Sequence, residues 1–284
     1  MHRKIKACFA AALAGACLLT AGGCGAIGAA VQGMTEEVME SLQQADPEDF
    51  TQKKQQDVPM DGVQKLVLEC GPTRDTADRA VAVSVQMEAS PDDRLHLRAS
   101  ANCDVPDKYL PSAVQKGAEL KISTGDGLDG TSAFTKERML QVTVQVPEDY
   151  QNTFHIAVNA GLFRADTLHS QDCQLTVSAG GARVGHFVGA GRITVNAGSA
   201  EIGDVALSGD LELKVNAGSA ECEMKKGSSF RFSAQKAAGA LETYFPTEKR
   251  GDWGRKQAAT VGGDPRHTLT VSVNAGSLEL TEGE

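Results

Sequence analysis

The residues best suited to hold a ligand gather near the C-terminus, in the stretch PTEKRGDWGRKQAATVGGDPR at 246–266. Trp253, the only tryptophan of the chain, stands between the basic pairs Lys249–Arg250 and Arg255–Lys256. Exposed aromatic rings and arginines are favoured at contact surfaces, and cationic side chains donate hydrogen bonds to anionic oxygens. We therefore take Trp253, Arg250, Arg255 and Lys256 as candidate binding residues for an anionic glycan or a partner. The competing interpretation is an insertion whose tryptophan covers an open end of the fold.

Residues that could catalyse a reaction do not form a recognisable group. Glycoside hydrolysis needs two carboxylates flanking one bond, but Asp204 and Asp210 lie in one repeat unit without matching acids one period away, and Asp166 is isolated. His155, His169 and His186 share no common position in the repeat. P-loop and nucleophile-elbow patterns are absent. The sequence therefore predicts no catalytic residue, no metal site and no cofactor.

A repeated sequence segment is expected to determine where the candidate binding residues lie in the fold. Six similar segments align on one glycine, namely Gly161, Gly180, Gly198, Gly218, Gly239 and Gly276, with spacings of 19, 18, 20, 21 and 37 residues. The last spacing holds either a degenerate unit or an insertion. A unit of this length buries too few apolar side chains to offset its conformational entropy, so the units must stack. The repeat predicts a parallel β-solenoid with short coils of about 19 residues.

Two columns of polar residues follow from this stacking. Asn159, Asn196, Asn216 and Asn274 share one position, where amides can hydrogen-bond from coil to coil. The alternative is a row of amides presented to a sugar or an ion. The second column reads Arg164, Arg183, Glu201, Glu221, Glu242 and Glu279 in chain order. It is either a solvated face or a site for a divalent cation or a basic partner.

The segments before the repeat differ in their periodicity. Residues 63–150 alternate apolar and polar residues between turn residues, which indicates strands. We expect a β-domain over 63–284, with an irregular part at 63–150 and regular repeats at 151–284. Val31, Met34, Val38 and Leu42 have helical spacing, so a short amphipathic helix is expected within 31–46. The polar stretch 46–62 is interpreted as a tether.

The N-terminus has the layout of a secretory signal peptide. A basic HRKIK at 2–6 precedes an apolar run at 7–21, which is shorter than a membrane span. The ending AGGC at 21–24 resembles a bacterial lipoprotein signal, although Ala21 stands where leucine is usual. The resemblance implies cleavage after residue 23 and a lipid on Cys24, so that 24–62 forms a lipid-anchored helix and tether. A secreted soluble protein and an uncleaved anchor are the alternatives.

Charge and cysteine content narrow the partners and the compartment. The chain has 37 acidic and 28 basic residues, a net charge of −9. Loss of residues 1–23 removes three basic residues and no acids, so the mature chain carries about −12 and repels nucleic acid. Four cysteines remain beyond Cys24: Cys70, Cys103, Cys173 and Cys222. They fit buried free thiols, or disulfides in an extracytoplasmic protein.

The repeated units, the lead-in VTVQVPEDY at 142–150 and the final TLTVSVNAGSLEL at 268–280 resemble the bacterial "putative adhesin" domain family. The resemblance covers roughly residues 63–284 and implies a β-solenoid without catalytic residues to transfer. We expect a non-catalytic lipoprotein on the bacterial cell membrane, outside the cytoplasm, whose domain binds a cell-wall, glycan or protein partner. The alternatives are a carbohydrate-active β-helix enzyme and an envelope protein that assembles by stacking of solenoids.

Overall fold

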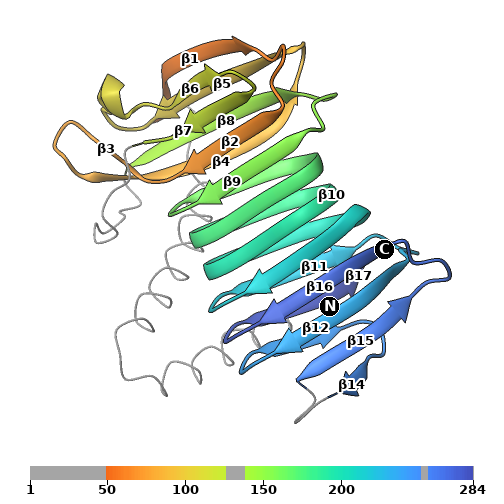
Figure 1. The fold of residues 1–284 in the computed structure, drawn as a ribbon. Helices are drawn as coiled ribbons and strands as arrows, with labels where there is room; N and C mark the ends of the chain where they lie inside the picture. The colour runs from red at the N-terminus through yellow and green to blue at the C-terminus, as the bar shows by residue number, and fades with distance from the viewer. Residues whose placement is uncertain (1–48, 126–137, 251–254, 284) are drawn as a thin grey trace.

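The computed structural model describes residues 49–125, 138–250 and 255–283, without the side chain of Arg250 (Figure 1). Within these ranges the regular structure is β-strand, apart from short 3₁₀ segments of which η2 covers Asp107–Tyr109. The expectation of an all-β chain is confirmed. No helix in the described part is long and apolar enough to span a membrane. The helix expected within 31–46 and the signal segment with Cys24 lie outside the described residues.

The strands form two faces that run along a stack. The first face has the order β6 (Ser112–Lys116), β7 (Glu119–Ser123), β2 (Lys65–Cys70), β9 (Thr153–Val158), β10 (Leu162–Val215), β16 (His267–Val273), β12 (Phe230–Lys236), β15 (Lys256–Val261) and β14 (Glu248–Arg250). The second face has the order β1 (Thr51–Pro59), β5 (Arg94–Ala101), β8 (Met139–Pro147), β4 (Ala80–Ser90), β10, β11 (Ser219–Met224), β17 (Ser277–Glu282) and β13 (Ala240–Thr243). The short β3 (Thr73–Arg74) pairs with β4.

Pairing along the middle of the stack is parallel, and antiparallel strands lie at one end of both faces and at the other end of the first face only. β2, β9, β10, β16 and β12 pair in parallel on the first face, and β8, β4, β10, β11, β17 and β13 do so on the second. Parallel pairing therefore reaches back to residue 65 and is not confined to 151–284. The antiparallel strands β1, β5 and β6 close one end, and at the other end β15 and β14 follow β12, the last parallel strand of the first face (Figure 1).

Glycines mark where successive turns of the chain touch. A Cβ on Gly218 would collide with the backbone of Gly198, and one on Gly276 would collide with the backbone of Gly218. A Cβ on Gly239 would in turn collide with Gly276. Only glycine permits this approach of one backbone to the next. The recurring glycine of the sequence is thus the contact point between neighbouring turns.

The spatial order of the last two repeat units differs from their chain order. Residues 267–282 lie between 211–224 and 230–243, because β16 pairs with both β10 and β12, and β17 pairs with both β11 and β13. The expected chain order of the charged column was wrong for its last two residues, because Glu279 lies next to Glu221 and Glu242 lies beyond it. Asn274 continues the asparagine column on Asn216, whereas Ala237 occupies that position in the outer unit. The units that carry the asparagine therefore lie next to one another, and the unit that has Ala237 in its place lies at the end of the stack.

The inner side chains alternate with outer ones, as the period of two requires. The core is one continuous cluster of mainly aliphatic residues that includes Leu66, Ile156, Val195, Leu213 and Val271. Larger rings fill the end that β12 forms, where Phe230 and Phe232 are buried. Buried rings also lie in the middle of the stack, at Phe154, Phe163 and Phe187.

The tether expected over 46–62 is corrected by the structure. Thr51–Pro59 form β1, which pairs antiparallel with β5 and buries Val58. The strand is polar because it lies at a sheet edge, where lysines and glutamines discourage further strand pairing. The Gln56 side chain closes the edge: its Nε2 donates to Ala113 O at 2.6 Å, and Ala113 N–H donates to its Oε1 at 3.1 Å. Period-two alternation could not reveal a strand with one buried side chain.

Candidate functional site

The basic stretch of the sequence forms a hairpin at the C-terminal end of the stack. β15 pairs antiparallel with β12, and β14 pairs antiparallel with β15. The backbone of Arg250 lies opposite Lys256, and Lys249 lies opposite Gln257. The N–H of Lys236 donates to Arg255 O at 2.7 Å, which fixes the start of β15 against the end of β12. We refer to residues 246–261 as the basic hairpin.

An aromatic cluster anchors this polar hairpin to the core. Phe245 is buried and makes edge-to-face contacts with Phe230, Phe232 and Tyr244, with ring centroids 4.9 to 5.8 Å apart. Such pairs add about 0.5–1.5 kcal/mol each beyond area burial. Gln257 is also buried, and its Oε1 accepts a hydrogen bond from the Thr247 hydroxyl at 3.1 Å. The hairpin is therefore fixed at its base, and its charged residues project from a rigid support.

The structure brings together two of the four predicted binding residues. Arg255 and Lys256 are exposed neighbours, and exposed Lys249 lies on the adjacent strand. The backbone of Arg250 faces Lys256, but its side chain and all of Trp253 lie outside the described residues. Lys249 lies opposite Gln257 and Lys256 lies opposite Arg250, so the side chains of Lys249 and Lys256 point to opposite sides of the hairpin. The described side chains donate hydrogen bonds and carry positive charge, which suits retention of an anionic group and not proton transfer.

A second set of charged residues runs the length of the second face. On the outer side, neighbouring strands place side by side Arg98, Thr143, Gln86, Arg164, Arg183, Glu201, Glu221, Glu279 and Glu242, which we call the charged row. The arginines fall in one half of the row and the glutamates in the other. Arg183 and Glu201 meet at the change of sign, with an N–O distance of 3.0 Å. The predicted column is thus confirmed as an array and continues beyond the repeats.

The glutamate half of the charged row is electrostatically strained. Partial burial raises the pKa of Glu221, and the carboxylates of Glu201, Glu279 and Glu223 raise it further. Arg183 opposes this rise. Strand spacing of ~4.8 Å brings like charges within reach of one another on successive strands. The glutamates of the charged row therefore repel one another along the second face.

The asparagine column forms the predicted ladder of hydrogen bonds. Asn216 Nδ2 donates to Asn196 Oδ1 at 2.7 Å, and Asn274 Nδ2 donates to Asn216 Oδ1 at 2.6 Å. Each amide thus joins its neighbour along the stack. For these three residues the structural interpretation is confirmed, because their donor and acceptor atoms serve the fold.

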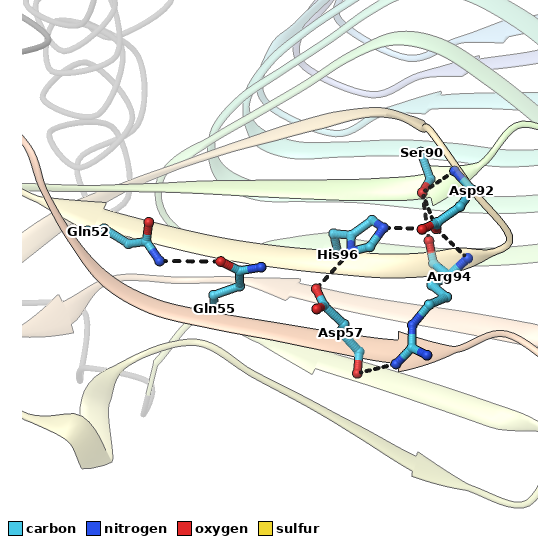
Figure 2. Close-up of polar contacts among 7 residues, drawn as sticks. All are labelled: Gln52, Gln55, Asp57, Ser90, Asp92, Arg94 and His96. Atoms are coloured by element: carbon cyan, nitrogen blue, oxygen red, sulfur yellow. Dashed lines mark hydrogen bonds and ion pairs between the residues drawn. The ribbon is translucent and has the colours of Figure 1, made fainter.

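A histidine held between two aspartates was not predicted from the sequence. Figure 2 shows His96 on β5 pointing at Asp57 of β1 and at Asp92 of the turn before β5. Its Nδ1 lies 2.7 Å from Asp57 Oδ1, and its Nε2 lies 2.8 Å from Asp92 Oδ1. A neutral imidazole has one N–H, so both contacts are hydrogen bonds only in the imidazolium form. The bond to Asp57 is the main cause that raises the pKa of His96; burial opposes it, and Asp92 adds to it.

This cluster ties an edge strand to a turn. The Arg94 guanidinium donates to Asp57 O at 3.4 Å, and Arg94 N–H donates to Asp92 Oδ1 at 2.9 Å. The hydrogen bond with His96 lowers the pKa of Asp57, and the bond from Arg94 N–H lowers that of Asp92. Asp57 lies 39 residues from His96, so no local motif could have indicated the pair. Both imidazole nitrogens are engaged, which suits a structural ion pair.

The remaining chemically active residues are dispersed over the described part of the chain. Its cysteines Cys70, Cys103, Cys173 and Cys222 are free thiols, and burial raises the pKa of Cys70, Cys173 and Cys222 to about 12. Such thiols are poor nucleophiles. The three acids considered for catalysis have separate partners: Gln86 for Asp166, His186 for Asp204 and the N–H of Thr268 for Asp210. Within the described ranges no cluster of His, Cys, Asp and Glu side chains could hold a metal ion.

Comparison with known proteins gives a likeness of fold. No family model matches the sequence, and no curated protein matches it. A "putative cell adhesion protein" from Clostridium sporogenes ATCC 15579 is similar in structure, with 14% identity, coverage of 82% of this chain and 100% of that chain, and a TM-score of 0.52. A "putative adhesin" from Bacteroides fragilis NCTC 9343 has 13% identity, covers 80% and 96% of the two chains, and gives a TM-score of 0.38. At these identities the first likeness supports the fold.

Proposed function

We propose that this chain is a non-catalytic, lipid-anchored protein of the bacterial cell surface that binds an anionic wall or glycan component through its basic hairpin. The observation that carries the proposal is that Lys249, Arg255 and Lys256 are all exposed on one anchored hairpin of a protein with a net charge of −9. An acidic protein that concentrates cations at one end offers anions a local site. Trp253 and Arg250 belong to the same proposed surface.

The architecture we propose for this binding domain is a β-solenoid. The parallel strand pairs, the glycine contacts and the asparagine ladder support it. A stack of this kind offers long exposed faces and ends instead of an enclosed pocket, which suits adhesion better than catalysis. The resemblance to the adhesin domain family supports the same interpretation, and so does the fold shared with a "putative cell adhesion protein". Antiparallel strands at one end of both faces and at the other end of the first face favour surface binding over end-to-end stacking of solenoids.

The location of the protein forms part of the proposal. The signal-like N-terminus and the cysteine at position 24 support cleavage, lipidation at Cys24 and anchoring on the outer side of the cell membrane. A Cys24→Ser variant tests this directly. It should leave the membrane fraction and lose incorporation of labelled fatty acid. Retention of the variant in the membrane fraction with unchanged labelling would contradict the anchor.

The binding proposal is tested with purified protein and an array of wall fragments and glycans that includes neutral and anionic members. The variant Lys249→Glu/Arg255→Glu/Lys256→Glu should lose anion binding by about tenfold or more, because it replaces attraction by repulsion at three positions. A matched control, Lys116→Glu/Lys121→Glu/Lys108→Glu, makes the same charge change at the other end of the stack and should bind as the wild type does. Trp253→Ala measures the contribution of the ring. Equal loss in both triple variants would show a net-charge effect and refute the assignment to the hairpin.

A further inference from the structure

The basic hairpin continues a row of polar side chains that crosses the outer surface of the first face. Strands β10, β16, β12 and β15 lie side by side on this face (Figure 1). Their in-register positions include Lys214, Ser272, Gln235 and Lys256. On each strand the residue next to this position is buried, so the four side chains lie on the outer surface. The hairpin cation Lys256 is therefore one member of a longer row.

The row extends by one more turn of the chain along the stack. The N–H of Asn216 donates to Val195 O at 2.8 Å, which aligns the segment of Thr194 with that of Lys214. The ladder bond from Asn216 to Asn196 fixes the same alignment. Thr194 lies between two buried neighbours and points outward, as Lys214 does. We call Thr194, Lys214, Ser272, Gln235 and Lys256 the polar row. Four strand spacings of ~4.8 Å give it a length of roughly 20 Å.

The two cations of the polar row differ from other cations on this face in their lack of acidic partners. Ion pairs on the same outer surface include Lys65–Glu119, Lys121–Glu69 and Arg192–Glu212, with N–O distances of 3.0, 2.8 and 2.7 Å. Lys214 and Lys256 form no ion pair with any residue that the structure describes. Glu212, two positions before Lys214, is already held by Arg192. On a protein with a net charge of −9, this uncompensated positive charge favours an anionic ligand.

The neutral members of the polar row suit the part of a ligand that lies between its charges. Lys214 and Lys256 are three strands apart, roughly 14 Å, a distance that suits two separate anionic groups better than one. The Ser272 hydroxyl and the Gln235 amide lie between them, and both groups donate and accept hydrogen bonds. A linear chain with anionic groups at intervals and hydroxyls between them matches this order. Lys249 points to the other side of the hairpin and does not belong to the row.

We propose that a linear anionic wall polymer, made of hydroxyl-bearing units with repeated phosphate or carboxylate groups, lies across the strands of the first face along the polar row. This inference rests on the proposed function, because it treats the basic hairpin as one end of the surface that the polymer contacts. The short side chains of Thr194 and Ser272 leave room for an extended chain. Added salt weakens these surface contacts. A chain held at several points dissociates less readily than a single unit, so affinity rises with chain length.

Titration of the purified protein with anionic chains of defined length tests the proposal. A polyol phosphate and an acidic oligosaccharide distinguish the two sources of negative charge, each supplied as a single repeating unit and as a chain longer than the polar row. A chain that occupies the row should bind about tenfold tighter or more than its single unit. Lys214→Glu should reduce this gain several-fold and leave binding of the single unit unchanged. Thr194→Lys adds a cation to the row and should strengthen binding of the long chain.

The matched control for these variants is Lys225→Glu. Lys225 is exposed and follows β11 of the second face, so the same change of charge there should leave the affinity for the long chain unchanged. Melting temperatures of the variants near that of the wild type show that a loss of binding does not come from unfolding.

The outcomes separate this inference from the proposed function. Equal binding of single units and long chains by the wild type, or wild-type binding of the long chain by Lys214→Glu, would overturn the polar row, and loss of binding in the hairpin triple variant would then leave the hairpin as the whole site. A wild type that binds no anionic polymer would overturn both the row and the proposed function. An acidic peptide of the same length that binds as tightly as the polymers would refute a wall polymer as the occupant.

Discussion

Replacement of Gly276 by alanine tests the contact that sets the spacing of the stack. The new Cβ would collide with the backbone O and N of Gly218 and with Val215 Cγ1. Backbone atoms cannot rotate away as a flexible side chain can, so neighbouring turns must separate. Overpacking of this kind costs roughly 1–3 kcal/mol, and reduced freedom of the unfolded chain returns about 0.4–1 kcal/mol. At about 2–4 °C per kcal/mol for a domain of this size, Gly276→Ala should lower the melting temperature by up to about 10 °C.

The matched control is Gly263→Ala. A Cβ at Gly263 meets no heavy atom within 4 Å, and the residue is exposed. Its melting temperature should lie within about 2 °C of the wild type, since surface substitutions usually stay within about 0.5 kcal/mol. Circular dichroism at one scan rate compares the three proteins. Equal melting of Gly276→Ala and Gly263→Ala would refute the close packing of Gly276 on Gly218.

Three further predictions follow from the stack and its polar contacts. Glu221→Cys with Glu279→Cys should form a disulfide on mild oxidation, whereas Glu221→Cys with Glu242→Cys should not. In-register positions on neighbouring strands lie ~4.8 Å apart, and positions two strands apart are separated by about twice that distance. The opposite result would mean that the last units lie in chain order. Asn216→Ala removes two ladder hydrogen bonds and should cost about 1–3 kcal/mol in urea unfolding, while Asn274→Ala, which removes one, should cost less. The raised pKa of His96 means that the folded protein binds the proton more tightly than the unfolded chain, so its stabilisation is complete below the unfolded pKa of ~6.5 and is lost as pH rises through the folded pKa. Melting from pH 6 to 9 should show this loss in the wild type and not in His96→Gln; the same slope in both would refute the double ion pair.

Much of the fold is readable from short-range pattern. The alternation of Leu66, Leu68 and Cys70 predicts a strand, and all three are buried in β2. The glycine column predicts contacts between turns, because a position where only glycine fits recurs wherever backbones meet. The asparagine ladder follows in the same way from identical side chains at one position. These features depend on residues within one repeat unit.

Features that depend on contacts between distant residues were not predictable. The polar strand β1 became recognisable only beside β5, and the His96 cluster needs Asp57 from that strand. The spatial order of the last two units depends on two contacts. The unit with Asn274 continues the asparagine ladder, and the unit with Phe230 and Phe232 forms the end of the parallel stack. The charged residues of the insertion at 246–266 are evident from the sequence. The packing of Phe245 that anchors the insertion to the core was not predictable, because it depends on contacts with Phe230 and Phe232.

The measurement that tests the proposed function most directly is the affinity of the purified protein for anionic wall polymers, measured by titration for the wild type and the two triple lysine and arginine variants. We expect saturable binding that weakens with salt and falls about tenfold or more in Lys249→Glu/Arg255→Glu/Lys256→Glu. The control with the same charge change at the opposite end should retain wild-type affinity. Absence of binding by the wild type, or undiminished binding by the hairpin variant, would contradict the proposal.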